Sequence, residues 1–209
     1  MTILALEFSS AQRSVALARD GIVLSEAMDS GGVHVTNAFG LIEKVLAEGK
    51  MSRAEIEVIA IGLGPGSYTG IRAAIAVAQG WQLATGVKLL GVSSADSLAA
   101  QAQAAKMFGR VNVVIDAQRG EFYLATWDIS GTQREIVSPL QIVSAAEVAA
   151  RRAEDEICTG PAVEPALYPS ASTVARLAAE RTDFLPGEKL EPVYLRETSF
   201  VKAPLPRVF

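Results

Sequence analysis

The stretch Ile59-Ala60-Ile61-Gly62-Leu63-Gly64-Pro65-Gly66-Ser67-Tyr68-Thr69-Gly70-Ile71-Arg72 decides the fold of this chain. The apolar, β-branched run 56–61 has the length of a buried strand, and the alanine-rich segment 71–84 predicts a helix. Four glycines and one proline in residues 62–70 require a sharp turn, a positive φ or a close backbone approach. Ser67 or Thr69 is placed to cap the helix.

A strand, a glycine-rich turn and a helix N-terminus together suit a bound anion, because unpaired amide groups point outward there. Two known phosphate loops do not match. No lysine follows Gly70, as a Walker A motif requires, and Ser67 and Thr69 stand where a dinucleotide motif needs its third glycine. The local sequence leaves two interpretations open, an anion site and a tight structural connection.

The composition limits the class of protein. The chain has 209 residues, 50% of them hydrophobic, so it can bury one large core or two modest ones. A net charge of −4 argues against autonomous nucleic-acid binding, which favours a basic face. One cysteine excludes an internal disulfide and fits a reducing compartment. Without a leader-like N-terminus or an apolar run of about 18 residues, we expect a soluble cytoplasmic protein.

The order of predicted elements repeats. The first half shows strands at 2–8, 14–19 and 22–27, with Asp20-Gly21 as a hairpin turn, then a helix at 33–48, the strand 56–61 and the helix to 84. A strand at 89–92 and a helix through 105 follow. The second half shows strands at 111–116, 121–127 and 133–137, a helix at 144–152, a strand at 156–159 and a helix at 172–181.

Both halves therefore predict a βββαβα order, without obvious residue identity, and the second copy is the smaller. We expect a first lobe over residues 1–106 and a smaller second lobe over 107–209. The proline-containing tail from Leu185 onward is expected to be extended and to pack back on the first lobe.

Two lobes of this order, each opening with a strand that ends in an acid, resemble the actin, sugar kinase and heat-shock chaperone ATPase superfamily. This resemblance implies a two-lobed α/β actin-like ATPase fold (ASKHA, ribonuclease H-like) with a duplicated βββαβα core. In that superfamily the turn after each lobe's first strand holds nucleotide phosphates. Here those turns are 7–10 and 116–121.

Three motifs narrow the resemblance to the TsaB (YeaZ) family. The loop 64–72 is similar to its signature, 115–123 to its second-lobe motif Asp-Ala-Arg-x-x-Glu-Val-Tyr, and 191–196 to its Pro-x-Tyr-Leu-Arg ending. The motif residues that the resemblance marks as structural are Gly64, Pro65, Gly66, Gly70, Arg119, Glu121, Tyr123, Pro192, Tyr194 and Arg196. Two positions depart from the family: Glu7-Phe8-Ser9 replaces the usual Asp-Thr-Ser, and Gln118 replaces Arg.

The resemblance implies a function. TsaB proteins are non-catalytic partners of TsaD, which completes threonylcarbamoylation of adenosine 37 in tRNA. A chain of this kind is expected to form a heterodimer with TsaD, to join TsaE in a larger complex and to meet tRNA only indirectly. For the isolated chain the sequence leaves two states open, a monomer and a homodimer. The two first-lobe helices carry the interface in that family. The expected interface residues are Val35, Phe39, Ile42, Tyr68, Thr69, Ile71, Arg72, Ile75 and Gln79.

The residues argue against catalysis by this chain. A catalytic transition-metal site takes about three protein ligands, and this chain has one histidine, His34, and one cysteine, Cys158. Ala38 stands four residues after His34, so no metal-binding pair lies on that helix. We expect no metal site, and we expect Cys158 to be a small buried hydrophobic residue. Asp116, Arg119, Glu121 and Tyr123 are expected to form an internal ion-pair cluster at the lobe junction.

The superfamily resemblance also predicts where a nucleotide would bind. By the superfamily resemblance, phosphates and Mg²⁺ would lie near Glu7, Ser9, Ser10, Gly64, Gly66, Ser67 and Asp116. We expect that no cofactor is required, and that ATP or ADP with Mg²⁺, where bound, lies at the partner interface. The alternative function is a small-molecule kinase or ATPase that uses Glu7 and Asp116 with Mg-ATP. A metallopeptidase-like protein is a third interpretation, which the missing ligands disfavour.

Overall fold

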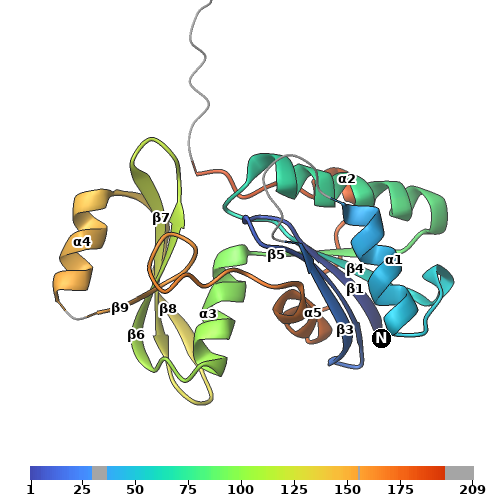
Figure 1. The fold of residues 1–209 in the computed structure, drawn as a ribbon, viewed down its shortest axis with the longest axis horizontal. Coiled ribbons are helices and arrows are strands. Elements are labelled where there is room, and N and C mark those ends of the chain that lie inside the picture. The colour runs from blue at the N-terminus through green and yellow to red at the C-terminus, as the bar shows by residue number, and fades with distance from the viewer. Residues whose placement is uncertain (30–36, 155, 196–209) are drawn as a thin grey trace, which may run out of the picture.

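The computed structural model describes residues 1–29, 37–154 and 156–195, which form two sheets with helices against their faces (Figure 1). The first sheet has the strand order β3-β2-β1-β4-β5 and the second the order β8-β7-β6-β9. The strands are β1 (Thr2–Glu7), β2 (Arg13–Arg19), β3 (Ile22–Asp29), β4 (Val58–Gly62), β5 (Lys88–Val92), β6 (Gly109–Asp116), β7 (Glu121–Ile129), β8 (Arg134–Ser144) and β9 (Ile157–Thr159). The helices are α1 (Ala38–Glu48), α2 (Tyr68–Thr85), α3 (Ser94–Ala104), α4 (Ala145–Ala153) and α5 (Ala171–Ala179), with 3-10 turns at Arg53–Glu55 and Gly187–Lys189.

The duplicated core is confirmed. In each sheet the first three strands of the half pair antiparallel in sequence order, and the fourth pairs parallel with the first. Asp20 and Gly21 both have positive φ, as the predicted hairpin turn requires. Ser144 caps α4 in a capping box with Glu147, as its spacing predicts. The actin-like fold class follows from this repeated topology.

One strand is longer than predicted. The sequence indicates a strand at 133–137, whereas β8 runs to Ser144 and includes Pro139. Pro139 falls at an irregularity of the β7–β8 register, between the pairs Leu124–Gln141 and Thr126–Ser138, and β8 is an edge strand, so a residue without an N–H is tolerated there. The predicted helix 33–48 is observed from Ala38, and its first residues lie outside the described part of the chain.

Four apolar clusters fill the layers. In the first lobe, α1 and α2 cover one face of the sheet and α5 covers the other. In the second lobe, α3 covers one face and α4 the other. Because helices cover both faces of this sheet, β1 and β4 are buried along their whole length, and most of their residues are apolar.

The last helix of each half packs on the sheet of the other half. α3, at the end of the first half, packs through Leu98 and Ala102 on the second sheet. α5, at the end of the second half, packs through Val174 and Ala178 on the first sheet. Figure 1 shows α3 between the two sheets and α5 against the first. The division of the chain at 106/107 stays a prediction. The helix α3 precedes this boundary but packs on the second sheet, and α5 follows it but packs on the first sheet.

Candidate functional site between the lobes

The glycine-rich loop packs directly on the turn after β1. A Cβ on Gly70 would lie 2.0 Å from the carbonyl oxygen of Phe8, and one on Gly66 would lie 2.1 Å from that of Ser9. The Ser67 amide donates a hydrogen bond to the Ser9 carbonyl at 2.6 Å. Ser67, rather than Thr69, caps α2 by accepting from the Gly70 amide. These glycines are therefore required by close contact between two segments of the same chain.

Glu7 ends β1 as a fully buried carboxylate. Its Oε1 accepts from the Ser9 amide at 2.8 Å, and its Oε2 accepts from the Ser94 hydroxyl at 3.1 Å. Gly62 leaves room for this group, since a Cβ there would lie 2.0 Å from Oε2. Burial raises the pKa of Glu7, although the bonds from Ser9 and Ser94 act in the opposite direction. Both carboxylate oxygens are thus engaged inside the first lobe.

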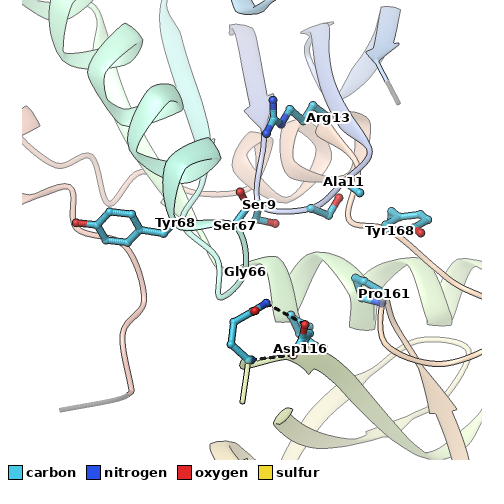
Figure 2. A pocket seen from close by; sticks show the side chains of 12 residues that line it. Ser9, Ala11, Arg13, Gly66, Ser67, Tyr68, Asp116, Pro161 and Tyr168 are labelled. Atoms are coloured by element: carbon cyan, nitrogen blue, oxygen red, sulfur yellow. Dashed lines mark hydrogen bonds between the residues drawn. The ribbon is translucent and has the colours of Figure 1, made fainter. Parts of the chain in front are cut away.

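A cavity of about 580 Å³ lies between the lobes and is lined by residues of both. Figure 2 shows the turn after β1 on one side of it, Asp116 on another, and Pro161 and Tyr168 closing a third. The lining residues are Ser9, Ser10, Ala11, Arg13, Gly66, Ser67, Tyr68, Ile115, Asp116, Gln118, Pro161 and Tyr168. Of the seven residues expected to surround a nucleotide, the structure therefore places Ser9, Ser10, Gly66, Ser67 and Asp116 in one cavity.

Asp116 brings an exposed carboxylate to this cavity from the second lobe. It accepts from the amide of Gln118 at 2.7 Å and from the side-chain nitrogen of Gln118 at 2.9 Å, drawn as dashed lines in Figure 2. Gln118 and Arg119 both have positive φ, so the turn is tight. Arg119 is exposed, while Tyr123 packs at the edge of the apolar cluster under α3. Gln118, which departs from the family pattern, thus holds the Asp116 carboxylate.

The residues around the cavity do not suit a magnesium–nucleotide complex held by this chain alone. The Glu7 carboxylate is buried and satisfied, and the Ser67 amide is used by Ser9. A Cβ added at Gly66 or Gly70 would meet a carbonyl oxygen of the turn after β1, so that side of the glycine-rich loop is occupied within this chain. Asp116 remains as a carboxylate at the cavity surface.

The expected interface residues divide into two groups. Ile42, Ile71 and Ile75 are buried in the core of their own lobe, and the Gln79 side chain donates to the Gly187 carbonyl. Phe39, Tyr68, Thr69 and Arg72 are exposed, and Val35 lies outside the described residues. The exposed members lie on α1 and at the start of α2.

The tail motif lies against the glycine-rich loop. The Val193 amide donates to the Leu63 carbonyl at 2.8 Å. The Tyr194 ring lies 5.6 Å from the Tyr68 ring, between centroids. Pro192 is half-buried, and Arg196 lies outside the described residues. Two motifs distant in sequence, the loop and the tail, are therefore in contact.

Within the described part of the chain, no group of three or more histidine, cysteine, aspartate or glutamate side chains is arranged to hold a metal ion. His34 lies outside that part. Cys158 is half-buried against the apolar cluster under α4, and burial raises the pKa of its thiol. No helix of the described residues is both long and apolar enough to cross a membrane.

Sequence reasoning missed several residues that shape this site. Ser94 is recognisable only as part of a helix start, yet it binds the Glu7 carboxylate. Arg13 and Tyr168 line the cavity from segments without a local motif. These two residues can be identified only once the fold has brought their distant segments together.

Comparison with known proteins gives consistent results. The model of the family described as "TsaD: tRNA N6-adenosine threonylcarbamoyltransferase" matches residues 4–181. A relative from Escherichia coli, the tRNA threonylcarbamoyladenosine biosynthesis protein TsaB, is 34% identical over 61% of this chain and 55% of its own length. The Bacillus subtilis protein of the same name is 29% identical over 70% of this chain and 64% of its own length. The chain therefore spans less than two thirds of these relatives.

Two solved structures from Pseudomonas aeruginosa have the same fold. YeaZ superposes with a TM-score of 0.77 at 25% identity, covering 93% of this chain and 99% of that one. A protein described as uncharacterized, with similarity to peptidase YEAZ, gives a TM-score of 0.78 at 26% identity and the same coverage. The resemblance to TsaB and YeaZ proteins is confirmed: the TsaB relatives match 61% and 70% of this chain, and the YeaZ structure covers 93% of it.

Proposed function

Because this chain belongs to the TsaD family of tRNA N6-adenosine threonylcarbamoyltransferases and is similar to TsaB and YeaZ proteins, we propose that it is a partner subunit in threonylcarbamoylation of tRNA. In this proposal it pairs with the catalytic TsaD subunit through α1 and α2. It promotes transfer to adenosine 37 without supplying catalytic residues, and it meets tRNA only through the complex.

The observation that carries the proposal is an exposed stripe on α2. Residues 69, 72, 76, 80 and 83 recur at spacings of three and four, so they share one helix face, and all are exposed. The opposite face is buried in the first lobe. Leu83, near the C-terminal end of α2, adds a large apolar side chain to the stripe and is 90% exposed. Ala76 and Gly80 in the middle of the stripe allow the backbone of a second helix to approach closely.

A neighbouring groove between α1 and α2 supplies the apolar contact area. Its cavity of about 390 Å³ is lined mainly by apolar side chains: Phe39, Ile42, Ala54, Trp81 and Ala84, with Arg53 and Thr85 at its rim. Phe39 is 68% exposed. A large aromatic side chain beside an open apolar groove is typical of the centre of a protein interface. Figure 1 shows α1 and α2 side by side on one face of the first sheet.

The buried Glu7 supports a non-catalytic role. A carboxylate that binds metal–phosphate must present its oxygens to the ligand, whereas both Glu7 oxygens accept bonds from Ser9 and Ser94. The proposal therefore requires no cofactor of this chain. ADP or ATP with Mg²⁺ in the complex would bind at the cavity beside Asp116, and the partner would supply the other ligands of the Mg²⁺ and the phosphates.

The test is reconstitution. The purified chain is expected to copurify with TsaD and to show no transferase activity alone. Activity on tRNA is expected when TsaD, TsaE, ATP and an activated threonylcarbamoyl donor are added, and to be lost when this chain is omitted. Transfer by the isolated chain, or full activity of TsaD and TsaE without it, would overturn the proposal. Without TsaD, the same α2 face is expected to form a homodimer, which light scattering over a concentration series measures.

The alternative of a kinase or ATPase is tested by calorimetry with Mg-ATP. The cavity beside Asp116 is the feature that favours it. Tight binding by the lone chain, abolished by Asp116→Asn, would support the alternative. We expect no measurable heat of binding, because the amide and carboxylate groups that would hold the phosphates and Mg²⁺ are used internally.

A further inference from the structure

Residues 185–195, here called the strap, follow α5 and run along the first lobe. The Leu185 amide donates to the Leu89 carbonyl at 2.9 Å, and the Val193 amide to the Leu63 carbonyl at 2.8 Å. Leu190, which is 4% exposed, is part of the apolar cluster under α1 and α2. The strap is thus anchored by its backbone at both ends and by a buried side chain between them.

Two glutamines of α2 hold the middle of the strap. The Gln82 side-chain oxygen accepts from the Gly187 amide, and the Gln79 side-chain nitrogen donates to the Gly187 carbonyl, both at 2.8 Å. A Cβ on Gly187 would lie 2.9 Å from the Gln82 oxygen, so the contact is close. These bonds fix the strap relative to the same helix that carries the exposed stripe.

The strap ends in an exposed aromatic cluster at the start of α2. The Tyr194 ring is tilted by 34° against the Tyr68 ring, with centroids 5.6 Å apart. The Arg72 guanidinium lies 5.1 Å from the centroid of the Tyr68 ring, and its Nη1 donates to the Tyr68 hydroxyl. Tyr68 is 53%, Tyr194 51% and Leu195 41% exposed. Large aromatic side chains are therefore held in place and yet left half open to solvent.

We propose that the strap extends the partner-binding face of α2 beyond the helix, and that Tyr194 is a binding hot spot on it; this inference rests on the proposed function. The cluster continues the stripe, because Thr69 and Arg72 lie at one end of that stripe and Leu83 at the other. Ordered tyrosine and arginine side chains are the residue types that dominate binding energy, since little side-chain entropy is lost when they are covered.

The positive charge at the N-terminal end of the α2 stripe indicates the kind of partner. Arg72 is the one charged residue of the five-residue stripe, and it lies near the N-terminal end of α2, which begins at Tyr68. A partner helix that runs antiparallel to α2 brings its C-terminal end, with partial negative charge, to this guanidinium. An apolar side chain in the last turn of that helix would then cover the Tyr68–Tyr194 pair. The occupant is thus the C-terminal end of a helix of the TsaD-type partner.

The experiment measures the Kd for TsaD of five purified variants beside the wild-type chain. Tyr194→Ala is expected to weaken binding about tenfold, because the exposed ring that it removes is a hot spot. Tyr194→Phe keeps the ring and is expected to bind within about twofold of wild type. Ile136→Ala is the matched control, since Ile136 is 60% exposed on β8, on the second sheet. Leu83→Asp tests the stripe itself.

The outcomes separate the two proposals. Binding weakened by Leu83→Asp but unchanged by Tyr194→Ala would overturn this inference and leave the proposed function standing. A wild-type chain that does not bind TsaD would overturn both. Circular dichroism melting of each variant shows whether the fold is kept. If Tyr194→Ala loses its fold, Arg72→Glu serves in its place, because it leaves both tyrosine rings present. This variant is also expected to bind TsaD about tenfold more weakly than wild type. Wild-type affinity in Arg72→Glu would contradict the antiparallel partner helix.

Discussion

The buried carboxylate of Glu7 accepts a hydrogen bond from the hydroxyl of Ser94 at 3.1 Å, and this bond ties the end of β1 to the first turn of α3. The Ser94 hydroxyl also lies 2.9 Å from the Ser9 hydroxyl, whose residue lines the interlobe cavity. Because α3 packs on the second sheet, one small polar cluster links the first sheet, the cavity and the helix of the second lobe. The carboxylate therefore has a structural partner at the position where the superfamily resemblance predicts a ligand.

The first prediction concerns Glu7→Gln. Burial raises the pKa of Glu7, so the folded protein binds this proton more tightly than the unfolded chain does. The stabilising contribution is present at pH values below the ordinary pKa of 4.5, and it is lost as pH rises through the folded pKa. The neutral amide in Glu7→Gln removes this dependence. We expect the melting temperature of wild type to fall relative to that of Glu7→Gln as pH rises from 4.5.

Melting curves of both proteins across the acidic and neutral range measure this difference. Glu57→Gln is a matched control, because Glu57 is 61% exposed. A wild-type minus Glu7→Gln difference that stays constant with pH would show that Glu7 does not titrate abnormally.

The second prediction compares two glycines of α2. Alanine is favoured over glycine inside a helix by about 1 kcal/mol, so propensity alone predicts that both substitutions stabilise. Gly80 has no heavy atom within 4 Å of its added Cβ, and Gly80→Ala is expected to raise the unfolding free energy by about 1 kcal/mol. In Gly70→Ala the Cβ would meet the Phe8 carbonyl at 2.0 Å, so a loss of about 1–3 kcal/mol is expected.

Denaturant unfolding of the two variants measures both values. Stabilisation by Gly70→Ala would show that the loop does not pack on the turn after β1 as closely as described. Gly80→Ala has a second readout, because an added methyl on the stripe is expected to weaken TsaD binding even though the monomer becomes more stable.

The sequence predicted those parts of the fold that local signals determine. Asp20-Gly21, the Ser144–Glu147 spacing and the apolar runs of β1 and β4 each identify an element within a few residues. The exchange of α3 and α5 between the sheets was not predictable in this way. The exchange depends on which sheet the apolar face of each helix packs against, and the two helices have similar alanine-rich faces.

The candidate site was predicted as a set of residues but not as a geometry. The orientation of Glu7 depends on Gly62 and Ser94, which lie far from it in sequence, and no local pattern encodes those contacts. The interface prediction shows the same limit. Ile71 and Ile75 have the helical spacing of a packing face, but periodicity does not distinguish a core in the same lobe from a partner.

The third prediction concerns Leu83→Asp. Because this side chain is 90% exposed, the substitution is expected to change the unfolding free energy by no more than about 0.5 kcal/mol. A carboxylate at the end of the stripe must be desolvated when a partner helix covers it, so TsaD binding is expected to weaken at least tenfold, or about 1.4 kcal/mol. Isothermal calorimetry and melting curves measure the two effects. Unchanged affinity would show that the α2 stripe is not the partner face.

The last prediction concerns the hydroxyl of Tyr194. Partial burial, together with the neighbouring Tyr68, raises the pKa of Tyr194 from 10.0 to about 12. The folded state therefore retains this proton where the unfolded chain loses it, and the resulting stabilisation is complete below pH 10 and disappears as pH rises to about 12. Ultraviolet titration of the phenolate in wild type and Tyr194→Phe is expected to assign the late-titrating group to Tyr194. Tyr68→Phe is expected to lower that pKa, because the charge and hydrogen bond of its neighbour are removed. If Tyr194 instead titrates at its ordinary pKa in wild type, its ring is not held against Tyr68, and the strap is not ordered at that end.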